Sequence, residues 1–219
     1  VALLKDILNT KVDSTDDVRE LTHASSLGTV PQATILDDSR PVVVAQPAGS
    51  EAEEFRRIRT NLSFLTTTAT QGHGRLLVIT STDPSEGKTT VSSNVAVALA
   101  EEGKSQKYWK PNLHIMPAGK RPANASILLN SDLMKEMVEQ ALTQYDYVII
   151  DTAPLSVAND ATVFGRMAGG LVLVTGKGVV EKKELENTAK NYYYYYYEDG
   201  NKRSSHKGAK SKGEKKARK

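Results

Sequence analysis

The sequence predicts an α/β fold in which a parallel sheet is flanked by helices. Three short apolar runs carry this prediction, because unbroken runs of this length are typical of strands buried on both faces. They are Leu76–Ile79, Val148–Ile150 and Leu171–Val174. Segments with helical spacing alternate with these runs, as the crossover connections of a parallel sheet require.

The first fifty residues are expected to form a linker ahead of a domain over residues 51–190. Ser14 with Asp17 three residues later resembles a capping box at the start of a helix. Pro31, Pro41 and Pro47 then indicate turns. The stretch Val42–Ala45 predicts an edge strand or an extended segment.

Residues 51–68 predict the first helix of the domain. Its apolar side chains recur at helical spacing and would form one buried stripe; they are Phe55, Ile58, Leu62 and Leu65. After the first strand, Val91, Val95 and Leu99 mark a second helix that ends at Gly103.

The second half of the chain predicts three more helices. Ser131 is a candidate N-cap for a helix with six apolar residues, namely Leu133, Met134, Met137, Val138, Ala141 and Leu142. Val163, Phe164 and Met167 indicate a helix before the third strand, and residues 180–190 a charged helix after it.

Composition excludes several classes of protein. Without cysteine there is no disulfide framework, thiolate metal site or cysteine nucleophile. No apolar stretch approaches the roughly 20 residues of a membrane span, and no signal peptide is visible, so the segment is expected to be soluble. The net charge of +3 combines a strongly basic tail, residues 201–219, with an acidic body. Residues 191–219, a tyrosine run and this tail, are expected to be disordered.

The most specific motif is Ser85, Glu86, Gly87, Lys88, Thr89 and Thr90. It lies between a predicted strand and a predicted helix, the context of a P-loop, and therefore predicts a P-loop NTPase-like fold that binds ATP. Gly87 lets the backbone approach a phosphate, and N–H groups at the helix start bind an anion. Lys88 would reach the β- and γ-phosphates, and the Thr89 hydroxyl would coordinate Mg²⁺. Thr82 stands where the standard pattern has its first glycine.

Asp151 follows the second apolar run, at its carboxyl end. A carboxylate in this position is the Walker B arrangement, which holds Mg²⁺ directly or through water. Ligands of open α/β sheets bind at the same edge. Alone, Asp151 would more simply cap the next turn, as Asp160 could cap its helix. With the P-loop present, Lys88 and Asp151 are the candidate catalytic residues, and Thr89 and Asp151 the candidate metal ligands.

Several segments are specific in combination: residues 53–61 (EEFRRIRTN), 83–90 (DPSEGKTT), 116–119 (MPAG), 145–154 (YDYVIIDTAP) and the six tyrosines at 192–197. Together they resemble the bacterial tyrosine kinases, or BY-kinases, of capsule and exopolysaccharide biosynthesis. The first segment is similar to the E-x-x-R-x-x-R-T-N helix of that family. The next three are similar to its Walker A loop, central stretch and Walker B motif. The tyrosine run resembles its C-terminal autophosphorylation cluster.

The resemblance implies an ATP- and Mg²⁺-dependent protein tyrosine autokinase that phosphorylates its C-terminal cluster in trans and regulates polysaccharide synthesis or export. The implied phosphoacceptors are Tyr192, Tyr193, Tyr194, Tyr195, Tyr196 and Tyr197. It also implies a ring-like homo-oligomer with Glu53, Arg56 and Arg59 at the subunit interface. The residues alone indicate only a solvated helix face with a Glu53–Arg56 pair.

The resemblance implies partners and a location as well. The partners are a transmembrane activator region upstream in the parent chain, a cognate tyrosine phosphatase and the polysaccharide polymerase or export machinery. The location is the cytoplasmic face of the bacterial plasma membrane. The basic tail predicts salt-dependent attraction to an anionic membrane surface. Nucleic acid is not among the expected partners.

One motif of the family is missing. The family follows its P-loop helix with a strand ending in D-x-D, the Walker A′ motif, which supplies a metal ligand and the base for tyrosine. Here Gly103 and Lys104 continue directly into residues 105–109 (SQKYW). Lys88 and Asp151 are 63 positions apart, tens of residues fewer than the family pattern. A strand before the tyrosines is missing too.

Two other functional classes fit the residues. A deviant-Walker ATPase of the septum-site or plasmid-partition type shares the fold and would use the basic tail on DNA or an anionic membrane. Such an ATPase has no need of the tyrosine run. A nucleotide-binding scaffold without turnover would fit the absence of the D-x-D motif.

Overall fold

The computed structural model describes residues 10–31, 40–65, 74–101, 112–120, 122 and 124–192. Three parallel strands form its sheet in the order β2-β1-β3. They are β1 (Arg75–Ser81), β2 (Tyr147–Asp151) and β3 (Val172–Val174). The register places Leu77 beside Ile149 and Thr80 beside Leu173. This confirms the predicted α/β class and the three predicted strands.

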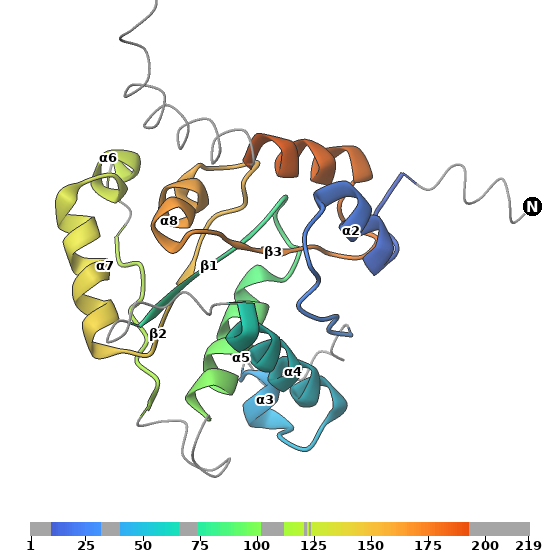
Figure 1. Ribbon diagram of the computed structural model, residues 1–219, viewed down its shortest axis with the longest axis horizontal. Helices are drawn as coiled ribbons and strands as arrows, with labels where there is room; N and C mark the ends of the chain where they lie inside the picture. Colours follow the sequence, from blue (N-terminus) through green and yellow to red (C-terminus); the bar gives the residue numbers. More distant parts are fainter. Residues whose placement is uncertain are drawn as a thin grey trace, which may run out of the picture.

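Helices lie on both sides of this sheet (Figure 1). They include α2 (Thr15–Thr22), α3 (Val42–Ala45), α4 (Ser50–Leu65), α5 (Lys88–Ala100), α6 (Ala125–Leu129), α7 (Asp132–Gln144) and α8 (Asp160–Ala168). A further helix, over residues 182–192, runs from beside α2 towards α8 in Figure 1.

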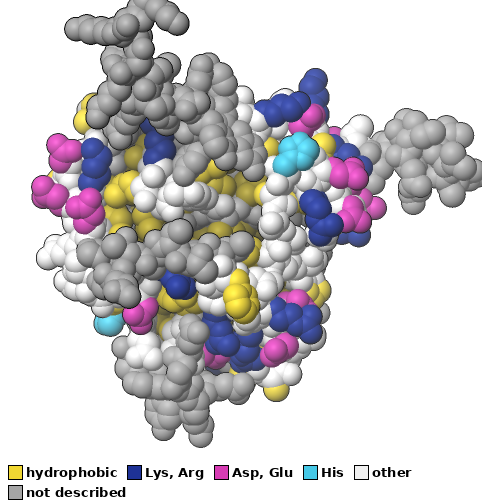
Figure 2. All heavy atoms as spheres, viewed as in Figure 1, with side chains coloured by type: hydrophobic (Ala, Val, Ile, Leu, Met, Phe, Trp, Pro, Cys, Tyr) yellow, Lys and Arg dark blue, Asp and Glu magenta, His cyan; other side chains and the backbone are white. Residues whose placement is uncertain are grey.

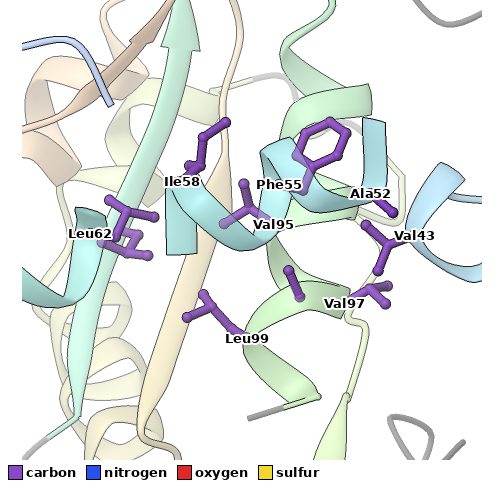
Figure 3. Close-up of a cluster of buried hydrophobic side chains, with 10 residues drawn as sticks. Val43, Ala52, Phe55, Ile58, Leu62, Val95, Val97 and Leu99 are labelled. Carbon is purple, nitrogen blue, oxygen red and sulfur yellow. The ribbon is translucent and has the colours of Figure 1, made fainter. Parts of the chain in front are cut away.

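One face of the sheet packs against α4 and α5. Phe55, Ile58 and Leu62 of α4 are buried together with Val95 of α5 and Leu77 of β1. Figure 3 shows the α4 and α5 side chains directed towards one another. The predicted apolar stripe is therefore the contact surface of α4, and it fixes the helix that begins at the P-loop.

The opposite face of the sheet packs against α7 and α8. Val78 of β1 contacts a cluster that contains Val138 of α7 and Phe164 of α8. Adjacent residues of β1 thus face opposite layers, as the alternation of a strand requires. Leu133 and Met137 of α7 remain 69% and 40% exposed, so the six apolar residues predicted for this helix do not all reach the core.

The helix caps predicted at Ser14 and Ser131 are present, whereas the N-cap residue of α8 is Asn159 and not Asp160. The Ser14 hydroxyl accepts from the backbone N–H of Asp17 at 3.1 Å, and the Asp17 carboxylate accepts from that of Ser14 at 3.3 Å. The Ser131 hydroxyl accepts from the N–H of Met134 at 3.2 Å. These bonds satisfy N–H groups that have no partner within the helix.

Val42–Ala45 is the helix α3, so the prediction of an edge strand or extended segment was wrong. The carbonyl of Pro41 accepts from the N–H groups of Val44 and Ala45. The buried Asn94 side chain of α5 accepts from the N–H of Val43 at 3.0 Å. Tertiary contacts therefore override the β propensity of three consecutive valines.

Strand β2 also differs from expectation, because the sequence predicted that it would be buried on both faces. Its apolar residues are only half-buried, and Asp151 is exposed. Within the described residues, β2 pairs with β1 alone, so its other edge has no neighbouring strand. None of the helices in the described ranges has the length and apolar character needed to cross a membrane.

Candidate active site

The loop between β1 and α5 adopts two left-handed backbone conformations. Ser85 has a φ of 66° and Gly87 a φ of 85°. Helix α5 begins directly afterwards at Lys88, with Gly87 as its N-cap residue. The turn therefore leads into a helix N-terminus, where unpaired N–H groups and the helix dipole favour an anion. The predicted P-loop has the strand–turn–helix context that phosphate binding requires.

Thr82 explains how this loop forms without the usual first glycine. It is almost completely buried, and its φ lies outside the left-handed region. Its backbone carbonyl accepts from the N–H of Ser156 at 3.0 Å. A residue with a side chain is compatible with this position because the backbone there does not need glycine's conformational freedom.

A short hydrogen bond joins the two predicted halves of the site, which are the P-loop helix and the end of β2. The Thr89 hydroxyl, on the first turn of α5, donates to a carboxylate oxygen of Asp151 at 2.7 Å. The two residues are 62 positions apart, and both are exposed. The carboxyl end of β2 and the start of α5 thus bring a hydroxyl and a carboxylate oxygen together.

Further hydrogen bonds hold the two halves in register. The N–H groups of Thr152 and Leu155 donate to the carbonyls of Ile79 and Ser81 at 3.0 and 2.9 Å. The Thr80 hydroxyl donates to the Ala153 carbonyl at 2.9 Å. The segment after Asp151 is therefore fastened to the end of β1, which restricts movement of Asp151 relative to the P-loop.

Glu86 holds the loop from inside. Its side chain is 7% exposed and accepts from the backbone N–H of Asp83 at 2.6 Å and from that of Gly176 at 2.8 Å. Burial raises the pKa of Glu86, although the backbone hydrogen bonds act in the opposite direction. Glu86 was predicted to bind nucleotide; its carboxylate is engaged with the protein backbone, so its backbone N–H is the group left to serve a phosphate.

A pair of carboxyl groups also lies at the loop, and the sequence did not predict it. A hydrogen bond between Glu184, on the helix over residues 182–192, and Asp83 raises the pKa of Glu184, and repulsion by Asp83 adds to this effect. The spacing of 101 positions gave no signal of this proximity. In the described part of the chain, no three His, Asp or Glu side chains gather as a metal site.

The three residues predicted at a subunit interface lie on α4, and two of them contact α5 within the chain. Arg56 forms an ion pair with Glu101 at 3.3 Å; these side chains are only 13% and 4% exposed. Arg59 donates to the carbonyl of Ala98 at 2.9 Å. Glu53 pairs with Arg56 at 3.5 Å and is 58% exposed. The two arginines therefore bind the C-terminal end of the helix whose N-terminal end forms the phosphate site.

A cavity of about 1,990 Å³ borders the P-loop at Ser85, Glu86 and Gly87. It extends along β3 and past Tyr192, but its lining does not include Lys88, Thr89 or Asp151. A hollow lined by apolar side chains is visible on the face shown in Figure 2. The side chains of Thr89 and Asp151 thus lie outside this cavity.

The described residues include only the first of the six predicted phosphoacceptors. It is Tyr192, which lies in the helix over residues 182–192. Tyr193–Tyr197, the basic tail and the segment 105–109 all lie outside the described residues.

The arrangement fits a Mg²⁺-bound nucleoside triphosphate. A hydroxyl and a carboxylate are hard oxygen donors of the type that Mg²⁺ prefers, and Thr89 and Asp151 bring them to 2.7 Å from one another. Lys88 is the first residue of α5, next to Thr89. Phosphoryl-transfer sites use groups of these kinds to hold phosphate and metal.

Comparison with known proteins agrees with this chemistry. No protein-family model matches the chain. The chain is 29% identical to the tyrosine-protein kinase YwqD of Bacillus subtilis (strain 168), with 75% of this chain and 87% of that protein covered. It is 30% identical to the tyrosine-protein kinase etk of Escherichia coli (strain K12), and this match covers 66% of this chain and 25% of that protein. The solved structure of the BceF tyrosine kinase domain covers 84% of this chain and is itself 94% covered, with a TM-score of 0.72 and 25% identity.

The extent of these matches differs. The chain spans most of the B. subtilis relative but only a quarter of the E. coli one. The B. subtilis alignment runs over 210 positions, although it covers only 75% of this 219-residue chain. Gaps of several tens of positions therefore fall within this chain, in agreement with the short distance between Lys88 and Asp151.

Proposed function

Because this chain belongs to the bacterial tyrosine kinases, we propose that it transfers the γ-phosphoryl group of ATP to tyrosines of its own C-terminal run, in trans between subunits. The observation that carries this proposal is the 2.7 Å contact between Thr89 and Asp151 at the start of the P-loop helix. This contact supports the proposal because it joins the P-loop helix to the carboxylate at the end of β2.

Thr89 and Asp151 would hold Mg²⁺, which supplies charge neutralisation at the phosphates when bound. Lys88 would place its ammonium group against the β- and γ-phosphates, where negative charge develops. The backbone N–H groups from Ser85 to Gly87, together with the start of α5, would orient the phosphate chain. Catalysis on this scheme consists of positioning and charge stabilisation.

In the transfer step, the phenolic oxygen of a tyrosine forms a bond to the γ-phosphorus while the bond to the β–γ bridging oxygen breaks. The phenol loses its proton and ADP leaves. An unperturbed tyrosine has a pKa near 10, so a nearby base would assist. The family's base belongs to the D-x-D motif, which this sequence lacks after Gly103.

The missing D-x-D motif favours one other function, that of a nucleotide-binding protein without turnover. The Thr89–Asp151 pair would still bind Mg²⁺-nucleotide in such a protein. The two proposals differ in whether phosphate reaches the tyrosines.

We further propose the homo-oligomer and the cellular context that the family implies. Glu53 supports a role for α4 between subunits, since its side chain is mostly exposed. Activity at the cytoplasmic face of the plasma membrane, with an activator region, a tyrosine phosphatase and polysaccharide polymerase or export machinery as partners, accords with the family. The basic tail over residues 201–219 would add attraction to anionic lipid.

The test is incubation of the purified chain with ATP and Mg²⁺, followed by intact-mass measurement and mapping of phosphate. The kinase proposal predicts phosphotyrosine within residues 192–197 that is abolished by Lys88→Met. ATP hydrolysis with unmodified tyrosines would identify an ATPase instead. Tight nucleotide binding with neither hydrolysis nor phosphotyrosine would identify a protein without turnover.

A further inference from the structure

Tyr192, the first of the six consecutive tyrosines, lies against helix α8. We propose that Tyr192 is an anchor that holds the helix over residues 182–192 on α8, and that Tyr192 is therefore not one of the phosphoacceptors. The part of this inference that concerns phosphorylation rests on the proposed kinase function. The part that concerns the anchor rests on geometry alone. The inference narrows the six phosphoacceptors that the sequence predicted.

The ring of Tyr192 lies directly against Gly165 in α8. A Cβ atom placed on Gly165 would be 3.1 Å from the Tyr192 hydroxyl oxygen and 3.5 Å from its Cε2 atom. That oxygen is buried. The atom that would have to attack the γ-phosphorus is thus held beneath a helix, in a space that exists because residue 165 has no side chain.

Glycine at position 165 is otherwise unfavourable. It lies inside α8, where glycine is destabilising relative to alanine because of its conformational entropy. Its φ is not in the left-handed region, and it is buried. The helix therefore gains nothing from glycine's backbone freedom at this point, and the close approach of Tyr192 is what the missing Cβ permits.

The helix that carries Tyr192 is fixed along its length. Leu185 is completely buried with Val12 and Val180, and Ala189 is 7% exposed. At its other end, Lys182 forms an ion pair with Asp17 at 2.8 Å. Freeing the Tyr192 hydroxyl therefore requires the turn of the packed helix that carries this residue to open, which is an unfavourable local unfolding step.

Phosphorylation would also be unfavourable at Tyr192 because of its product. A phosphotyrosine carries a charge of about −1.5 to −2 at neutral pH and three further oxygens. The Tyr192 hydroxyl oxygen is buried, and it lies close to Gly165 of α8. A phosphate on that oxygen would have to displace the helix contact or lose part of its hydration.

The first experiment measures phosphorylation of the full chain incubated with ATP and Mg²⁺. Cleavage after Lys190 and Lys202 releases one peptide with all six tyrosines, and fragment-ion sequencing assigns phosphate to each. We expect occupancy of Tyr192 to be about tenfold or more below the mean of Tyr193–Tyr197. In Gly165→Val, which fills the space under the ring, Tyr192 should rise towards that mean. The matched control is Gly170→Ala, because a Cβ at Gly170 meets nothing within 4 Å.

The second experiment, chemical nitration, does not need kinase activity. Nitration by tetranitromethane, read at Tyr192 in the same peptide, should be slow in the native chain and at least about tenfold faster in urea. Gly165→Val should remove most of this protection, and Gly170→Ala should keep it. Equal phosphate occupancy at Tyr192 and its neighbours, or equal nitration of Tyr192 with and without urea, would overturn the anchor. Absence of phosphotyrosine with Tyr192 still protected would overturn the kinase proposal and leave the anchor standing.

Discussion

At the scale of single residues, the P-loop depends on backbone conformations as much as on side chains. Ser85 has a φ of 66°, a region that an L-residue other than glycine enters at a cost. The residue is exposed, so its side chain contributes little packing. The loop therefore contains a local strain that a substitution can relieve.

Ser85→Gly should raise the free energy of unfolding by up to about 1 kcal/mol, since relief of the left-handed strain exceeds the entropy cost of glycine. Ser85→Val should lower it by about 1–2 kcal/mol. Denaturant titration measures both. Ser93→Gly, within α5, is the control and should be destabilising. Loss of stability in Ser85→Gly would show that the φ of Ser85 is not strained.

Glu86 predicts a specific pH dependence. Its pKa is raised by burial, so the folded chain binds this proton more tightly than the unfolded chain does. Its contribution to stability is greatest below the ordinary value of 4.5 and falls as pH rises from there through the raised pKa. As pH rises across that range, the unfolding free energy of the wild type should therefore fall relative to that of Glu86→Gln. A difference that is constant with pH would contradict the assignment.

At the scale of elements, the P-loop helix α5 is held at both ends. Its start carries Thr89 beside Asp151, and its C-terminal end accepts the guanidinium groups of Arg56 and Arg59 from α4. Cations at a helix C-terminus interact favourably with its dipole. The E-x-x-R-x-x-R segment thus has a role inside the chain, separate from the one proposed between subunits.

Arg56→Ala should lower the free energy of unfolding by about 3–5 kcal/mol, because it leaves Glu101 buried without its partner. Arg56→Met combined with Glu101→Leu should recover most of that loss. Glu53→Ala is the control, since the Glu53 side chain is largely exposed. Light scattering on the same variants measures the mass of the oligomer in solution. An Arg56→Ala variant that keeps its stability but loses mass would place Arg56 between subunits instead.

At the scale of the whole molecule, much of the site was predictable because its signals are local. The P-loop between a strand and a helix, Asp151 at the end of the next paired strand and the apolar stripe of α4 all follow from spacing within one or two elements. Parallel strands end at the same sheet edge, so Thr89 and Asp151 were expected to meet.

The features that sequence reasoning missed arise from contacts between distant segments. Val42–Ala45 is helical because Asn94 binds its backbone. Glu86 reaches Gly176, Arg56 reaches Glu101, and Tyr192 reaches Gly165, and each pair joins elements whose packing no local pattern encodes. The half-buried β2 has a different cause. The described sheet gives it one neighbour, where the family pattern would supply another strand.

The most direct test of the central claim, that Thr89 and Asp151 complete a tyrosine kinase site, is the intact mass of the chain after incubation with ATP and Mg²⁺. The wild type should gain phosphoryl groups, and Asp151→Asn should gain them at least about a hundredfold more slowly while unfolding at an unchanged temperature. Asp160→Asn, on the first turn of α8, is the matched control and should behave as the wild type. A wild-type chain that consumes ATP without gaining mass, or an Asp151→Asn chain phosphorylated at the wild-type rate, would contradict the account.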